Sequence, residues 1–179
     1  SATAGNIWAD QDHAFLGTGG NASGVAFWKV AVTGEPPVFL EEGTLEKSYK
    51  TNDVFGVGNY ALIATDVNSK EIIILDISST PYQEIGYVNP PENWSGSSVF
   101  ALNNNGVFTY THQTGNKLAI FDLSSFSGNR PIKASFILDN RVSDIFVDDK
   151  YIYLTLENTS NNNTIYDFVI YSYTDSSIS

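Results

Sequence analysis

Acidic and amide side chains recur along this chain at a nearly constant spacing. Asp53 and Asp144 each open a short apolar segment, and self-alignment of the chain places Asn6 and Val99 at the same position, with spacings of 47, 46 and 45 residues. If these positions begin equivalent strands, Asn6, Asp53 and Asp144 lie near one end of a shared channel. Paired carboxylates there could hold a ligand or a cation, or do acid/base chemistry. A carboxylate at such a position could instead accept backbone N–H bonds from an adjacent unit.

One short cluster has the residue types of a metal site. Asp10 and Asp12 stand at alternate positions in Asp10-Gln11-Asp12-His13, and oxygen ligands of this kind suit Ca²⁺. Ca²⁺ is therefore the one cofactor that the sequence suggests. The alternative is a polar turn, because the EF-hand pattern is absent and the segment aligns with the turns at 57–60 and 103–106. With two histidines and no cysteine, a converging zinc site is not expected.

A tryptophan in a loop is the best candidate for ligand contact. Trp94 follows Asn93 in the segment 89–97, which is longer than its counterparts and has no strand pattern. The flat apolar face of tryptophan suits stacking on a sugar, and loops often carry specificity on rigid folds. Trp94 and Asn93 are thus predicted to contact a ligand, with the channel mouth near Asp53 and Asp144 as the second candidate location. Packing of Trp94 in the core is the alternative.

Composition excludes some partners. Nine Lys plus Arg stand against twenty Asp plus Glu, for a formal charge of -11. Without a basic stripe, we expect no nucleic acid as a partner and no electrostatic contact with anionic lipid. No apolar run approaches the ~18–20 residues that a membrane span needs, so this segment is expected to make no membrane contact. The length fits a single domain, 1–179.

The strongest structural signal is repetition. Besides the positions of Asn6, Asp53, Val99 and Asp144, two further sets of positions recur with nearly the same period. One set consists of Lys29, Asp76, Asp122 and Ser172, and the other of Pro37, Pro81 and Pro131. Short strand-like segments separated by Asn, Gly, Ser, Asp and Pro fill each repeat. A period of 40–50 residues made of short strands is typical of propeller blades. The predicted fold is an all-β propeller with four recognisable blades of about 45 residues, approximately 6–50, 51–97, 98–141 and 142–179.

The fourth blade is predicted to lack an outer strand after Thr174. Because an unpaired strand edge invites further pairing, three interpretations remain open. The chain forms a complete four-bladed ring, a fragment of a larger ring, or a half-ring completed by a second chain. Self-association is expected if the ring is incomplete.

The second repeat resembles a known family. Gly58-Asn59-Tyr60-Ala61 and Ile73-Ile74-Leu75-Asp76-Ile77, followed by Pro81, are similar to the LVIVD repeat, a propeller repeat of bacterial and archaeal surface or exported proteins. The third repeat, with Leu118-Ala119-Ile120-Phe121-Asp122, matches less well. The resemblance covers about three-quarters of the chain and implies the propeller fold and an extracellular or cell-surface location. It says nothing about chemistry, because the repeat is structural.

Three functional hypotheses follow. The favoured one is a non-catalytic extracellular or cell-surface module that binds a protein or glycan, since no convergent catalytic set is visible. The first alternative is a structural subunit of a pilus-like surface filament whose N-terminal helix precedes Ser1. The second is a carbohydrate-active enzyme that uses Asp53 and Asp144 at the channel mouth.

Overall fold

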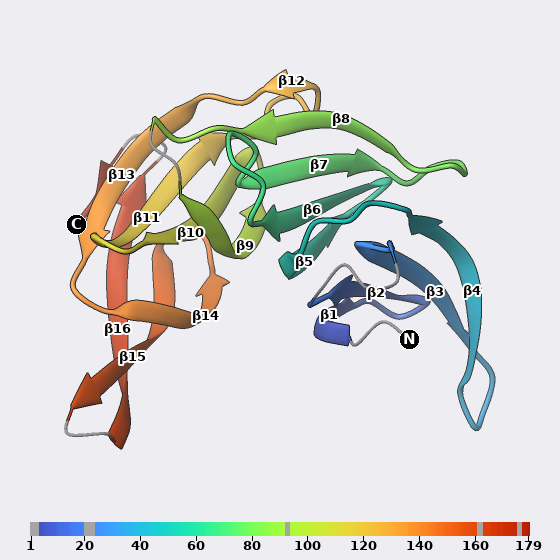
Figure 1. The fold of residues 1–179 in the computed structure, drawn as a ribbon, viewed down its shortest axis with the longest axis horizontal. Helices are drawn as coiled ribbons and strands as arrows, with labels where there is room; N and C mark the ends of the chain where they lie inside the picture. Colours follow the sequence, from blue (N-terminus) through green and yellow to red (C-terminus); the bar gives the residue numbers. More distant parts are fainter. Residues whose placement is uncertain (1–3, 20–23, 92–93, 161–162, 175–176) are drawn as a thin grey trace.

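The computed structural model describes residues 4–19, 24–91, 94–160, 163–174 and 177–179, and these form four β-sheets with no helix among them. We number the sheets units 1 to 4 in chain order. Within each unit the strands follow one another from the inner edge of the molecule to its outer edge (Figure 1). The chain then returns to the inner strand of the next unit, so each sheet corresponds to one repeat of the sequence.

The strand bounds are as follows. Unit 1 contains β1 (Ala4–Ala9), β2 (His13–Thr18), β3 (Phe27–Thr33) and β4 (Val38–Leu45). Unit 2 contains β5 (Thr51–Val57), β6 (Tyr60–Thr65), β7 (Ile72–Asp76) and β8 (Gln83–Val88). Unit 3 contains β9 (Ser95–Leu102), β10 (Asn105–His112), β11 (Gly115–Asp122) and β13 (Ile132–Leu138). Unit 4 contains β14 (Arg141–Val147), β15 (Tyr151–Ser160), β16 (Asn163–Thr174) and β17 (Ser177–Ile178). The short β12 (Gly128–Asn129) pairs in parallel with the outer edge of β8.

Local sequence explains the strands and their turns. The run Ile72–Leu75 in β7 is β-branched or aliphatic throughout, and all four side chains are fully buried. A strand is apolar on both faces when both faces are covered.

The hairpin between β5 and β6 turns through Gly58 and Asn59, and Gly58 has a φ of 56°. Asn103, which tolerates the same left-handed conformation, has a φ of 56° in the equivalent turn between β9 and β10.

The core is divided among the spaces between successive units. One cluster joins units 1 and 2, a second joins units 2 and 3, and a third joins units 3 and 4. Units 2 and 3 therefore each have two packed faces. We call the face that packs against the unit before it the preceding face, and the face that packs against the unit after it the following face. Burial of both faces at ~25 cal/mol per Å² of apolar surface is the main stabilising contribution in such an array.

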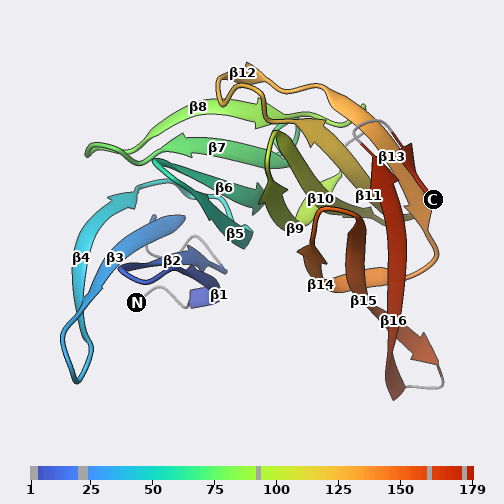
Figure 2. The same ribbon diagram turned by 180° about the vertical axis from the view of Figure 1, so that it is seen from behind.

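The four units form an open arc. The inner strand β1 contacts β5, β5 contacts β9, and β9 contacts β14. Seen from either side, units 1 and 4 lie at the two ends of this arc (Figures 1 and 2). Their outward-turned faces carry exposed apolar side chains that have buried counterparts in the inner units.

Aromatic side chains connect the inner strands along the arc. Trp8, Phe55, Phe100 and Phe146 hold the same position in β1, β5, β9 and β14. Their ring centroids are 5.7, 4.4 and 5.4 Å apart in succession. The repeat thus places one aromatic ring per unit in a continuous row.

Each inner strand also contains a β-bulge at one repeat position. The strand pairings shift by one residue at Gly5, Asn52, Ser97 and Ser143, which are separated by 47, 45 and 46 residues. A bulge leaves one residue out of the ladder and increases the local twist. Asn6, Asp53 and Asp144 each come directly after the bulge, so the prediction that they share one position on the inner strands is confirmed.

The pairing corrects three details of the sequence interpretation. Ser98, not Val99, follows the bulge in β9 and is the equivalent of Asp53. In unit 1 the equivalent of Asp76 is Ala31 rather than Lys29, because Lys29 pairs with Phe15 inside the strand. Unit 4 does have an outer strand, since the two-residue β17 pairs with Tyr173 and Thr174 of β16. The all-β prediction is confirmed.

Candidate functional site

A polar pocket of about 610 Å³ lies at the end of the inner strands where the bulges occur. All four bulge residues line it: Gly5, Asn52, Ser97 and Ser143. Because every unit contributes the same position of its inner strand, the pocket is a property of the whole arc rather than of one loop. Bulges commonly redirect side chains next to functional sites, and here they turn polar groups of four separate sheets toward one space.

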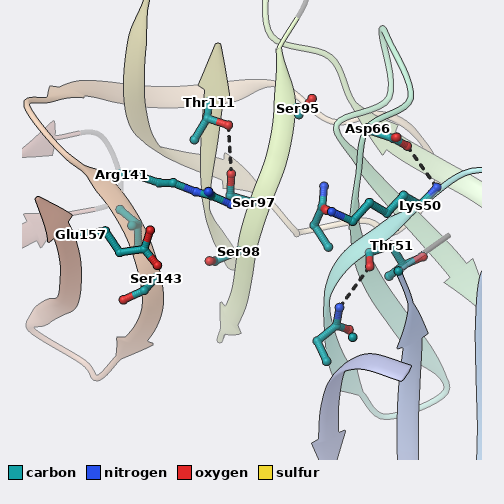
Figure 3. Close-up of a pocket in the computed structure, with 15 residues that line it drawn as sticks. Lys50, Thr51, Asp66, Ser95, Ser97, Ser98, Thr111, Arg141, Ser143 and Glu157 are labelled. Carbon is teal, nitrogen blue, oxygen red and sulfur yellow. Dashed lines mark hydrogen bonds between the residues drawn. The ribbon is translucent and has the colours of Figure 1, made fainter. Parts of the chain in front are cut away.

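Two cations and two carboxylates also line this pocket: Lys50, Arg141, Asp66 and Glu157. The Lys50 and Arg141 side chains extend into it from opposite sides (Figure 3). The remaining lining is mostly hydroxyl groups, including those of Ser95, Ser97, Ser98, Thr111 and Ser143. Charge is thus balanced within the pocket although the whole chain carries -11. This composition suits a neutral, polyhydroxylated ligand that both donates and accepts hydrogen bonds.

Hydrogen bonds hold the wall of the pocket in place. The Asn52 side-chain amide donates to the Gly96 carbonyl across units 2 and 3, with a distance of 2.7 Å. The Asn6 amide donates to the Thr51 carbonyl across units 1 and 2, at 3.1 Å. Ser143 and Thr155 hydroxyls are 2.7 Å apart within unit 4. The wall is therefore built of groups that connect neighbouring strands, which limits its rearrangement on binding.

Gly96 is needed for one of these contacts. A Cβ at this position would lie 2.1 Å from the carbonyl oxygen of Glu71. No side chain fits there, so glycine allows the start of β9 to approach unit 2 closely enough for the Asn52 bond.

Asp53 joins two units through its carboxylate. One oxygen accepts the backbone N–H of Val54 and the other accepts that of Val99 in unit 3, each at 2.9 Å. Burial raises the pKa of Asp53 to about 6, although the two N–H bonds favour the charged form, and the charge of Asp144 adds to the rise. The carboxylate acts here as an acceptor for the backbone of the next unit.

Asp144 occupies the same repeat position in unit 4, the last of the four sheets that the structure describes. It is exposed, and its carboxylate accepts the N–H of Ile145 at 2.8 Å. Neither Asp53 nor Asp144 is among the residues that line the pocket. Their role as ligand contacts or as an acid/base pair stays a prediction. Both carboxylates accept backbone N–H bonds, as the alternative interpretation expects.

Asp10 and Asp12 lie in a turn. One Asp10 oxygen accepts the N–H groups of Asp12 and His13, at 2.9 and 2.7 Å. The corresponding turn in unit 4 uses Asp148 in the same way, with Lys150 and Tyr151 as donors at 2.8 Å. Among the residues that the structure describes, no three His, Asp or Glu side chains gather as metal ligands. The pattern thus matches the polar-turn alternative, and the Ca²⁺ hypothesis stays a prediction.

Trp94 is part of the core between units 2 and 3. Its side chain is only 5% exposed. The indole lies edge-on against Tyr110 with 5.3 Å between ring centroids, and Lys117 Nζ lies 4.8 Å from the ring centroid. The free stacking face expected from the loop position is therefore absent, because β9 begins at Ser95 and draws Trp94 into the interior. Asn93 lies outside the described residues.

The pocket residues were not singled out by the sequence. Gly, Asn, Ser and Ser share no chemistry, so the bulge positions do not stand out as a motif. Their nearly constant spacing, one residue before Asn6, Asp53 and Asp144, is the one signal that could have located them.

No helix in the described parts of the chain is long and apolar enough to cross a membrane. No protein-family model matches the chain and no curated protein matches it, so the resemblance to the LVIVD repeat remains a prediction from its residues.

Proposed function

We propose that the chain is a propeller-type repeat array of the LVIVD kind and serves as a non-catalytic binding module. Support for the fold comes from four consecutive sheets, each running from an inner to an outer strand, with apolar cores between them. Propellers are built from such four-stranded blades. An extracellular or cell-surface location is part of the proposal and is supported by the acidic, cysteine-free composition.

We propose a carbohydrate as the ligand and the bulge-lined pocket as its site. The observation that carries this proposal is that polar inner-strand positions of all four units line one pocket. Sugar hydroxyls donate and accept hydrogen bonds equally well, and the pocket offers serine and threonine hydroxyls, an asparagine amide, two cations and two carboxylates. A strongly acidic ligand would gain from Lys50 and Arg141 but would be repelled by Asp66, Glu157 and the net charge.

A glycan array tests this proposal. The chain should retain a defined set of glycans, and Arg141→Ala should weaken that signal at least tenfold, because it removes up to five donors from the pocket. Lys150→Ala is the matched control, since Lys150 is exposed and does not line the pocket. An array without bound glycans, or equal loss in the two variants, would contradict the carbohydrate proposal.

A further inference from the structure

The two ends of the arc carry complementary halves of one interface. Ile7 in β1 is the repeat equivalent of Val54, Val99 and Ile145, by their positions relative to the bulges. Those three side chains are buried on the preceding faces of units 2 to 4, whereas Ile7 is 64% exposed. Leu16 and Trp28, the equivalents of the fully buried Ile63 and Ile73, are also partly exposed. Unit 1 therefore presents an uncovered preceding face.

Unit 4 presents the opposite face. Phe168 and Ile170 of β16 are the equivalents of Ile72 and Ile74 in unit 2. The two isoleucines are fully buried against unit 3, whereas Phe168 is 63% and Ile170 50% exposed. Phe146, the last ring of the aromatic row in the described residues, is 57% exposed. Unit 4 thus presents an uncovered following face.

We propose that these two faces bind each other between two copies of this chain. Every internal interface of the arc joins a following face to a preceding face, and the chain carries one unused face of each kind. A second copy supplies the matching half in the packing arrangement that the chain already uses three times.

The contact is head-to-tail, which has a definite consequence. A head-to-tail interface leaves one free face on each side of a dimer, so association proceeds to a closed ring or to an open chain of copies. The net charge of -11 opposes association at low ionic strength. Because salt screens this repulsion, added salt should favour the assembled form.

Two single variants test the arrangement. Phe168→Glu places a charge on the following face of unit 4 and leaves the preceding face of unit 1 intact. Ile7→Glu does the reverse. Both positions are exposed, so far-ultraviolet circular dichroism should show each variant folded as the wild type. Ile137→Glu is the control, because this side chain is 71% exposed on β13 and lies on neither end face.

Sedimentation velocity at about 100 µM, a concentration that populates micromolar interfaces, gives the readout. The wild type and Ile137→Glu should form assemblies larger than the monomer, and each face variant alone should be monomeric. An equimolar mixture of Phe168→Glu and Ile7→Glu should form dimers and stop there, since one intact interface remains. A monomeric wild type, or folded variants whose mixture stays monomeric, would overturn the proposal. Assembly of either face variant alone to the wild-type extent would do so as well.

Discussion

The Asp53 carboxylate accepts the backbone N–H of Val99, 46 residues later, at 2.9 Å, and so ties the inner strand of one repeat to that of the next. A second bond, from the N–H of Val54 at 2.9 Å, occupies the other carboxylate oxygen. Asp144 stands at the same position in unit 4, where it is exposed and accepts the N–H of Ile145 within its own strand. One repeat position is thus a structural link inside the arc and an exposed carboxylate at its end.

The stability contributed by Asp53 should depend on pH. Its pKa rises from 3.8 in the unfolded chain to about 6 in the folded protein. Between these values the folded protein keeps a proton that the unfolded chain releases, so this contribution is complete below 3.8 and is lost as pH rises through 6. The free energy of unfolding of the wild type minus that of Asp53→Asn should therefore be roughly 2 kcal/mol larger at pH 4 than at pH 7.

Urea unfolding of both proteins at several pH values measures this difference. Asp149→Asn is the control, because Asp149 is exposed and is not among the groups that shift the pKa of Asp53. If the two N–H bonds instead held the pKa of Asp53 below 3.8, the difference would shrink as pH falls, and the proposed effect of burial would be wrong.

The aromatic row should contribute unequally to stability along the arc. Phe100 contacts rings on both sides, at 4.4 Å from Phe55 and 5.4 Å from Phe146. Phe100→Ala should lower the free energy of unfolding by about 3 kcal/mol, the lower end of the range for buried phenylalanines, because Phe100 is itself partly buried. Phe146→Ala should cost about half as much, because that ring is largely exposed. Urea unfolding measures both losses. Equal losses would show that the contribution of a ring to stability does not depend on how many rings it contacts.

Trp94→Ala should behave as a core substitution. We expect a loss of about 3–5 kcal/mol in the free energy of unfolding, since the indole is buried between units 2 and 3 against Tyr110. Trp28→Ala is the comparison, because Trp28 is partly exposed on the uncovered preceding face of unit 1. Its loss in the free energy of unfolding should be smaller. Unchanged stability of Trp94→Ala with lost glycan binding would restore Trp94 as a ligand contact.

The Asp10 turn should depend on its carboxylate and not on a metal. Asp10→Ala removes the acceptor for two N–H groups and should cost roughly 1 kcal/mol. Addition of Ca²⁺ or of a chelator should leave the thermal midpoint of the wild type unchanged. Asp148→Ala should cost more, because this carboxylate also accepts the Tyr153 hydroxyl at 2.8 Å. A rise in the midpoint with Ca²⁺ that Asp10→Ala abolishes would support the metal site instead.

The repeat made much of the fold predictable. The spacing of Asn6, Asp53 and Asp144 is enough to identify equivalent positions on three inner strands. The alignment was wrong by one residue in the third repeat, where it chose Val99 instead of Ser98. The bulge residue of that strand, Ser97, has no distinctive residue type that would mark its position in the sequence. β17 was missed because it contains two residues, Ser177 and Ile178, too few to show a pattern.

The candidate site was less predictable because it depends on backbone geometry. A bulge redirects whichever side chain it contains, so Gly5, Asn52, Ser97 and Ser143 meet without sharing a chemical signature. Trp94 illustrates the opposite case: its loop sequence indicated exposure, but pairing from Ser95 onward brings the indole into the core. Burial of one side chain depends on packing against a unit distant in sequence, which a local pattern does not contain.

The most direct test of the proposed site is a chemical-shift map of the backbone amides. The chain, labelled with ¹⁵N, would be titrated with the glycan that gives the strongest array signal. The proposal predicts that the largest shifts fall on Asn52, Ser97 and Ser143, one in each of three units, with smaller shifts on the outer strands. Shifts confined to the outer strands or to the end faces of units 1 and 4 would contradict a binding site at the bulge-lined pocket.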